Sequence, residues 1–232
     1  MALDKTLADL GLDFVDEYLI HFPISQEFVP FDKLYPPEWI FPDGNGKIKL
    51  VDQDLCETWK AMEGLVQTGK ARTIGVCNFS TQLLRQIFST CSIKPSTLQV
   101  ELHPHNSQQK LVRFAHEHGM KVTAFSTFGS ASYVELDMAT AADSLMTNPQ
   151  ITEIAKAKSK TPAQILIRWA LERDTFPLTK TTNEERMKEN RGVLDFELTT
   201  EEMATINGLN LNRRYNDPGE FFEARLGPCA DR

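Results

Sequence analysis

Short apolar segments alternate with amphipathic ones along the whole chain. Segments that are apolar on both faces predict buried strands over residues 14–22, 73–79, 96–102, 121–128 and 176–180. Apolar residues at helical spacing predict helices over residues 53–69, 80–90, 107–118, 149–173 (in two pieces), 183–190 and 199–208. Buried strands that alternate with helices are typical of a parallel sheet with helices packed outside it.

Capping residues support several of these helices. The chain opens in an amphipathic segment that places Leu3, Leu7 and Leu10 on one helical face. Further helix starts are predicted at Ser107, at Thr161-Pro162, and at Thr199 with Glu202. These residue types accept hydrogen bonds from the first free N–H groups of a helix or fit its first turn.

Two parallel architectures fit the alternation: the open doubly wound sheet and the closed (β/α)8 barrel. A dinucleotide-binding doubly wound sheet carries Gly-x-Gly-x-x-Gly after its first strand, and the sequence contains no such run. Polar residues or glycine instead end every predicted strand, at His21, Cys77-Asn78, Gln99 with Glu101, Ser126 with Gly129, and Lys180-Thr181. Barrel active sites are assembled at such strand ends. The pattern predicts one α/β domain over residues 1–232, of the (β/α)8 TIM-type barrel architecture.

The composition is typical of a cytoplasmic enzyme. The 232 residues carry a net charge of −7 and a pI near 5.3, with Lys and Arg scattered among more numerous carboxylates. A nucleic-acid surface needs clustered cations, so no nucleic-acid partner is expected. The longest apolar run is shorter than the ~18 residues that span a bilayer, so no membrane partner is expected either.

Cysteine and histidine patterns give no indication of a metal site. The four cysteines form no Cys-x-x-Cys pair and no zinc-ligand spacing, so reduced thiols are expected. The pairs His103 with His105 and His116 with His118 lack a carboxylate or cysteine that would complete a ligand set. We therefore expect no bound metal.

Five motifs in a fixed order carry a resemblance to a known family. They are Leu19-Ile20-His21-Phe22-Pro23, Arg72-Thr73-Ile74-Gly75-Val76-Cys77-Asn78-Phe79, Gln99-Val100-Glu101-Leu102-His103-Pro104, Ala124-Phe125-Ser126-Thr127-Phe128-Gly129, and Lys180-Thr181-Thr182-Asn183 with Arg186, Glu189 and Asn190. At these residues the sequence resembles the aldo-keto reductases, within them the xylose reductase and aldose reductase-like branch. The resemblance extends from the opening helix to Asp217-Pro218.

The resemblance implies NAD(P)H-dependent reduction of an aldehyde or ketone, an aldose-like sugar or small carbonyl, to the alcohol by hydride transfer. His21 matches the family's histidine, and a neutral imidazole can orient and polarise a carbonyl without competing as an acid. Phe22 and Asn216 match substrate-contact positions, and Phe28 and Trp39 are expected to line the same pocket. These assignments imply a small-molecule carbonyl partner.

The resemblance also implies how the nicotinamide half of the cofactor would be held. Hydride transfer needs the nicotinamide ring fixed at one face and one angle. Asn78 and Gln99 match the positions that bind the carboxamide, and Cys77 takes a slot usually filled by serine, a stronger hydrogen-bond donor. Phe125 stands where an aromatic ring stacks on the nicotinamide. Further contacts to the cofactor are expected at Ser126, Phe128 and Ser130.

The adenosine half is expected at the last strand and the helix start that follows it. There, cationic side chains and free N–H groups can jointly hold a phosphate. The matching residues are Lys180, Thr181, Thr182, Asn183, Arg186, Glu189 and Asn190. NADP(H) is the implied cofactor, and NAD(H) is also compatible because Asn183 occurs in family members that tolerate NADH.

The predicted strands match strands 4–8 of the family's barrel, so we expect an incomplete barrel that lacks the first three units. Those units carry the family's general-acid tyrosine, the lysine that lowers its pKa and the aspartate that supports the lysine, which leaves catalytic competence open. Five strands cannot close an eight-stranded barrel, and unpaired edges favour self-association. Two alternatives stay open: a non-catalytic NADPH-binding module, and an interaction protein that binds a partner through these edges.

Overall fold

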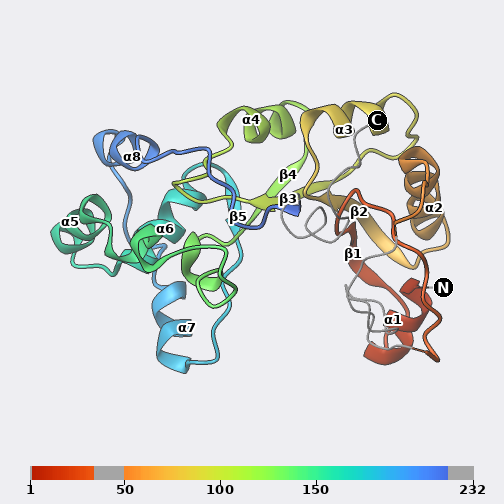
Figure 1. The fold of residues 1–232 in the computed structure, drawn as a ribbon, viewed down its shortest axis with the longest axis horizontal. Helices are drawn as coiled ribbons and strands as arrows, with labels where there is room; N and C mark the ends of the chain where they lie inside the picture. Colours follow the sequence, from red (N-terminus) through yellow and green to blue (C-terminus); the bar gives the residue numbers. More distant parts are fainter. Residues whose placement is uncertain (1, 34–49, 219–232) are drawn as a thin grey trace, which may run out of the picture.

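Five parallel strands form one sheet in sequence order. The computed structural model describes residues 2–33 and 50–218. The strands are β1 (Val15–Ile20), β2 (Ala71–Cys77), β3 (Thr97–Glu101), β4 (Lys121–Phe125) and β5 (Thr175–Pro177). Each coincides with a predicted strand to within a few residues. Figure 1 shows the sheet crossing the middle of the molecule from β1 to β5.

Helices alternate with the strands, and several of them pack against the sheet. They are α1 (Ala2–Leu10), α2 (Leu55–Gln67), α3 (Thr81–Phe88), α4 (Gln109–Glu117), α5 (Pro149–Lys158), α6 (Pro162–Leu171), α7 (Glu184–Arg191) and α8 (Thr200–Asn207). In Figure 1, α2, α3 and α4 follow one another along one side of the sheet. Helix α2 contacts β2, α4 contacts β4, and α6 contacts β5. This arrangement confirms the parallel α/β class.

The core lies between the strands and these helices. Val76 of β2 and Leu98 of β3 are fully buried and belong to the same apolar cluster as Leu84 of α3. Burial of each such side chain contributes about 1.5–3 kcal/mol. Side chains alternate along a strand, so the next residues, Cys77 and Gln99, point to the opposite face, where they are partners in register. One face of the sheet is thus occupied by packing, and the other carries polar groups.

Gly75 permits the close approach of β2 to its neighbours. A Cβ at this position would lie 2.6 Å from the Thr97 carbonyl oxygen and 2.7 Å from Leu19 Cδ2. Real Cβ atoms do not approach backbone oxygens this closely, so any side chain here would push β2 away from β3. Glycine at this position keeps the ends of these strands aligned.

Two of the predicted helix starts are confirmed and one is wrong. Thr161 and Thr199 each form a capping box at the start of α6 and α8. Ser107 does not cap α4, which begins after Gln108, a residue in the left-handed region at φ 45° with no side-chain cap. The Ser107 carbonyl instead accepts a hydrogen bond from Arg173 at 2.6 Å, and this contact draws it away from the helix axis.

The opening helix is confirmed, with one correction to its apolar face. Leu3 and Leu7 are buried in the core, whereas Leu10 is 58% exposed. The helix ends at Leu10, and Gly11 follows at φ 64°, so the chain turns before Leu10 can pack. The expectation that all three leucines share the buried face is therefore wrong for Leu10.

The two edges of the sheet are β1 and β5. Within the described residues, β1 pairs with β2 alone and β5 pairs with β4 alone. Phe176 and Leu178, in and just after β5, are about half exposed. None of the helices in the described ranges is long and apolar enough to cross a membrane. Trp39, expected in the substrate pocket, lies outside the described residues.

Candidate functional site

The carboxyl ends of the strands meet at one edge because the strands are parallel. Main-chain hydrogen bonds extend the pairing just past the strands: Asn78 N donates to Gln99 O at 2.9 Å. Leu178 N likewise donates to Ala124 O at 2.8 Å. Residues that were singled out in separate motifs are thus brought side by side in strand order.

His21 follows β1 directly and contacts the neighbouring strand end through its backbone. Its carbonyl oxygen accepts a hydrogen bond from Asn78 Nδ2 at 2.9 Å. The ring lies 4.8 Å from the buried ring of Phe22, centroid to centroid. Much of the imidazole is exposed, yet the protein around it removes enough water to lower the pKa of His21. The lowered pKa favours the neutral imidazole, which is the form that the predicted role requires.

Cys77 and Gln99 lie opposite each other in register, and Asn78 follows at the end of β2. Asn78 has φ 63°, the left-handed conformation that asparagine tolerates better than most residues. Desolvation by burial, with a smaller contribution from the Glu17 charge, raises the pKa of Cys77 to about 12. The thiol consequently stays protonated, and it can act as a weak donor but not as a thiolate nucleophile.

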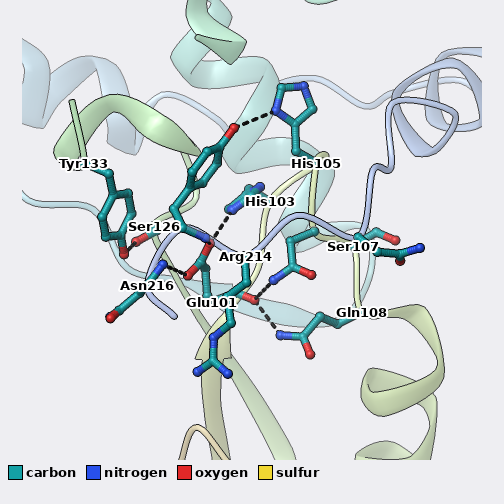
Figure 2. Close-up of polar contacts among 12 residues, drawn as sticks. Glu101, His103, His105, Ser107, Gln108, Ser126, Tyr133, Arg214 and Asn216 are labelled. Atoms are coloured by element: carbon teal, nitrogen blue, oxygen red, sulfur yellow. Dashed lines mark hydrogen bonds and ion pairs between the residues drawn. The ribbon is translucent and has the colours of Figure 1, made fainter. Parts of the chain in front are cut away.

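Glu101 is the centre of a buried polar network, which Figure 2 shows. Its carboxylate pairs with His103 Nε2 at 2.8 Å, and both side chains are almost fully buried. The backbone N–H groups of Tyr215 and Asn216 donate to its two oxygens at 2.7 Å each. The sequence indicated only that Glu101 was a polar strand-end residue. Tyr215 and Asn216 lie more than a hundred residues along the chain from Glu101, so no local signal could have identified them as its partners.

The same network reaches the end of β4. Ser126 Oγ is 2.7 Å from the hydroxyl of Tyr133 (Figure 2). The Tyr133 ring stacks on Tyr215 at 5.8 Å between centroids. Burial raises the pKa of Tyr133, and a hydrogen bond with the Asn216 side chain opposes this shift. Two predicted contact residues, Ser126 and Asn216, thus meet at one tyrosine that sequence reasoning did not select.

A pocket of about 280 Å³ joins the ends of β4 and β5. Its lining includes Phe125, Ser126 and Phe128 from one strand end and Lys180 from the other. Ser130 lies just beyond, fully buried, and its Oγ has no hydrogen-bond partner within the described residues. A buried hydroxyl without a partner is costly, so it is suited to accept a polar group from a ligand.

The predicted adenosine-binding residues lie on an exposed helix start. Asn183 caps α7 by accepting from Arg186 N at 3.0 Å, and its own N–H donates to Thr181 Oγ1 at 3.1 Å. Lys180 and Arg186 are exposed and make no salt bridge within the described ranges, and Thr182 beside them is also exposed. Two cations beside free N–H groups form a surface suited to a phosphate.

Two residues of this group have structural partners instead of a free surface. Glu189 accepts a hydrogen bond from the hydroxyl of Thr161, the cap of α6. Asn190 Nδ2 lies 3.4 Å from Thr179 Oγ1, at the margin of hydrogen-bond distance. Both side chains fasten α7 to neighbouring segments, and each retains one further polar atom for a ligand.

The histidine pairs have protein partners. His105 Nδ1 is 3.1 Å from the Tyr215 hydroxyl, and His103 pairs with Glu101. His116 and His118 bond to the carbonyl oxygens of Asp174 and Phe114. Within the described residues, no group of three or more His, Cys, Asp or Glu is placed to hold a metal ion.

The chain is similar to a known protein family and to individual members of it. Residues 1–211 match the model of the aldo/keto reductase family. The chain is 41% identical over 223 residues to the NADH-dependent D-xylose reductase of Candida parapsilosis, covering 95% of this chain and 68% of that protein. It is 43% identical over 222 residues to the NAD(P)H-dependent D-xylose reductase of Candida tenuis, covering 95% of this chain and 69% of that protein.

Solved structures give the same result. The aldose reductase of Schistosoma japonicum superposes with a TM-score of 0.81 at 34% identity, covering 96% of this chain and 67% of that one. A Bombyx mori aldo-keto reductase in complex with NADP superposes with a TM-score of 0.79 at 34% identity, covering 95% of this chain and 65% of that one. The strand ends described above occur within this shared fold, and the chain belongs to the aldo-keto reductase family.

Proposed function

We propose that the chain binds NADPH or NADH across the ends of β2 to β5 and serves the reduction of an aldose-like aldehyde or small carbonyl. The observation that carries the proposal is the pocket lined jointly by Phe125, Ser126, Phe128 and Lys180, because it connects the ring-stacking candidate Phe125 to the phosphate-binding candidate Lys180. The family membership and the names of the D-xylose reductases similar to it support this substrate class.

The nicotinamide half is assigned to the ends of β2, β3 and β4. NAD(P)H, when bound, supplies the hydride. In the proposal Asn78 and Gln99 hold the carboxamide, Cys77 adds a weak donor, and Phe125 stacks on the ring. Ser126, Phe128 and Ser130 contact the pyrophosphate. The unpartnered Ser130 Oγ supports this assignment, since a phosphate oxygen would accept its proton.

The adenosine half is assigned to the start of α7. Lys180 and Arg186 bind the 2′-phosphate as charge-assisted donors, and Thr181, Thr182 and Asn183 supply hydroxyl and N–H groups. Glu189 and Asn190 contact the adenine with the polar atoms that α7 packing leaves free. NADH lacks the 2′-phosphate but keeps every other contact, so both nucleotides bind and NADPH binds more tightly.

His21 is the carbonyl-orienting residue in this proposal. A neutral imidazole donates a hydrogen bond to the substrate oxygen, and the lowered pKa of His21 favours this neutral form. Phe22, whose ring contacts that of His21, and Asn216 are the proposed substrate contacts. The expectation that the family's proton-donating tyrosine lies outside residues 1–232 remains a prediction.

Titration of the chain with NADPH, followed by addition of D-xylose, tests the proposal. We expect saturable binding by calorimetry, and His21→Phe is expected to leave that binding intact. NADPH consumption after D-xylose addition would establish catalysis, and binding without consumption would favour the non-catalytic module. If NADPH produces no saturable heat or fluorescence change, the proposed function is wrong.

A second candidate, binding of another protein chain, is favoured by the two sheet edges. β1 and β5 leave one side unpaired within the described residues, and Phe176 and Leu178 are exposed beside β5. Self-association through these edges predicts concentration-dependent sedimentation that Leu178→Lys weakens. A single monomeric species at all concentrations would exclude it.

A further inference from the structure

The side-chain amide of Asn78 is held from both ends. Its Nδ2 donates to the His21 carbonyl at 2.9 Å, and its Oδ1 accepts from Arg214 Nη2 at 3.0 Å. A carbonyl oxygen can only accept and a guanidinium can only donate, so these partners fix which end of the amide is oxygen. One N–H and one lone-pair site of the amide remain. They are complementary to the carbonyl and NH2 of a primary carboxamide.

Arg214 is held in place by the buried carboxylate of Glu101. The next two residues, Tyr215 and Asn216, donate their N–H groups to the two oxygens of that carboxylate, as Figure 2 shows. Glu101 is also paired with His103 in a site where neither side chain reaches solvent. The segment cannot shift without unpairing a buried charge, so the position of the guanidinium is fixed by β3.

The contacts of Arg214 are unusual for an arginine that serves packing alone. Buried or half-buried arginines usually pair with carboxylates. Within the described residues, the side-chain hydrogen bond of Arg214 goes to the neutral amide oxygen of Asn78, and its Nε is buried without a partner. Its neighbour Arg213 shows the common pattern instead, since it forms an ion pair with Asp143.

We infer that Arg214 is a positioning residue that sets the amide of Asn78 for the nicotinamide carboxamide, with Glu101 as its anchor. The inference rests on the proposed function and adds a specificity to it. With Arg214 present, the amide presents its acceptor to the carboxamide NH2. Without Arg214, the amide keeps its bond to the His21 carbonyl but loses the donor that holds its oxygen, so its terminal torsion is less restrained and selection for a carboxamide over other ring substituents is lost.

The experiment compares three nucleotides on the natural chain and on Arg214→Met, by calorimetric titration. NADP⁺ carries the carboxamide, its 3-acetylpyridine analogue replaces the NH2 by a methyl group, and adenosine 2′,5′-bisphosphate has no nicotinamide. The natural chain is expected to bind NADP⁺ about tenfold more tightly than the acetylpyridine analogue, the value of one hydrogen bond. Arg214→Met is expected to remove that preference and to leave adenosine 2′,5′-bisphosphate binding unchanged.

Three further variants separate positioning from folding. Arg213→Met removes a neighbouring arginine that does not contact Asn78, so it is expected to keep the preference. Arg214→Lys retains a cationic donor and is expected to keep part of the preference for NADP⁺. This variant tests the inference even if Arg214→Met folds poorly. In an Asn78→Ala background the preference is already absent, and Arg214→Met is expected to change it no further.

The outcomes distinguish the inference from the proposed function. If Arg214→Met weakens all three nucleotides equally, Arg214 is structural and the inference is wrong. The inference is also wrong if the natural chain binds the nucleotides without preferring NADP⁺, or if Arg214→Met keeps the preference; the proposed function survives both results. If the natural chain binds none of the three, both are wrong.

Discussion

The two ends of the proposed nucleotide site have opposite physical character. The carboxamide region, defined as Asn78, Gln99, Glu101 and residues 214–216, is buried or half-buried, and hydrogen bonds join Arg214 to Asn78 and the backbone of Tyr215 and Asn216 to Glu101. The phosphate region, residues 180–190, is largely exposed, and within the described residues its two leading cations, Lys180 and Arg186, make no salt bridge. One region is organised by the protein itself, whereas the other is left to be organised by a ligand.

This difference follows from what each region would recognise. A carboxamide is neutral and small, so it is selected by donors and acceptors whose orientation is fixed in advance. A phosphate is highly charged and is bound by charge-assisted hydrogen bonds from cationic side chains, which can stay exposed to water until the ligand binds. Changes in the carboxamide region should therefore affect folding and specificity, and changes in the phosphate region should affect affinity alone.

Removal of the buried Glu101 carboxylate is expected to have the largest effect on folding. Glu101→Ala is expected to lower the free energy of unfolding by about 3–5 kcal/mol, because it leaves buried His103 and two backbone N–H groups without their acceptor. Urea denaturation measures the change. Arg113→Ala, which breaks an exposed pair with Glu117, is the control and is expected to cost less than about 1 kcal/mol. Equal losses from the two variants would contradict the distinction.

Neutralisation of the exposed cations is expected to weaken nucleotide binding and to leave folding nearly unchanged. Lys180→Met and Arg186→Met are each expected to weaken NADPH binding about 10- to 100-fold, the value of one charged hydrogen bond, and to leave NADH binding and the unfolding midpoint nearly unchanged. Lys188→Met serves as a matched control, because Lys188 is on the same helix but is paired with Glu184 and Glu185. Equal losses for NADPH and NADH would show that these cations do not read the 2′-phosphate.

The buried thiol gives the smallest effect and a pH dependence. The pKa of Cys77 is raised to about 12 from an ordinary value of 9.0, so the folded state resists ionisation that the unfolded chain permits. This contribution to stability is complete below about pH 9 and is lost as the pH rises toward 12. Between pH 9 and pH 10 the natural chain is expected to lose about 1 kcal/mol more than Cys77→Ser. Parallel curves for the two proteins would contradict the assigned burial.

The sequence predicted the strands and helices well because their signals are local. Periodicity located all five strands, and capping boxes located α6 and α8. The sequence-based prediction failed where the role of a residue depends on contacts with distant segments. Ser107 is drawn off its helix by Arg173, and Glu101 gains its role from Tyr215 and Asn216, whose approach depends on the complete fold. Residues 178–180 were predicted as strand, but β5 ends at Pro177.

For the candidate site, too, the sequence identified some residues, whereas others were found only through their contacts in the fold. Motif resemblance selected Asn78, Gln99 and Lys180, and the structure brings them to neighbouring strand ends. Two residues that contact strand-end candidates, Arg214 at Asn78 and Tyr133 at Ser126, were not selected from the sequence. Positioning residues were therefore invisible in the sequence, because their significance lies in contacts between strand ends and the C-terminal segment.

Hydrogen exchange with and without saturating NADPH tests whether the carboxamide region is organised by the protein and the phosphate region by the ligand, because it follows both regions in one experiment. We expect residues 99–103 and 214–216 to exchange slowly already in the free protein, and their exchange rates to change little when NADPH binds. We also expect residues 180–190 to exchange quickly in the free protein and to become protected when NADPH binds. Fast exchange at residues 214–216 in the free protein, or unchanged exchange at residues 180–190 in the presence of NADPH, would contradict this difference between the two regions.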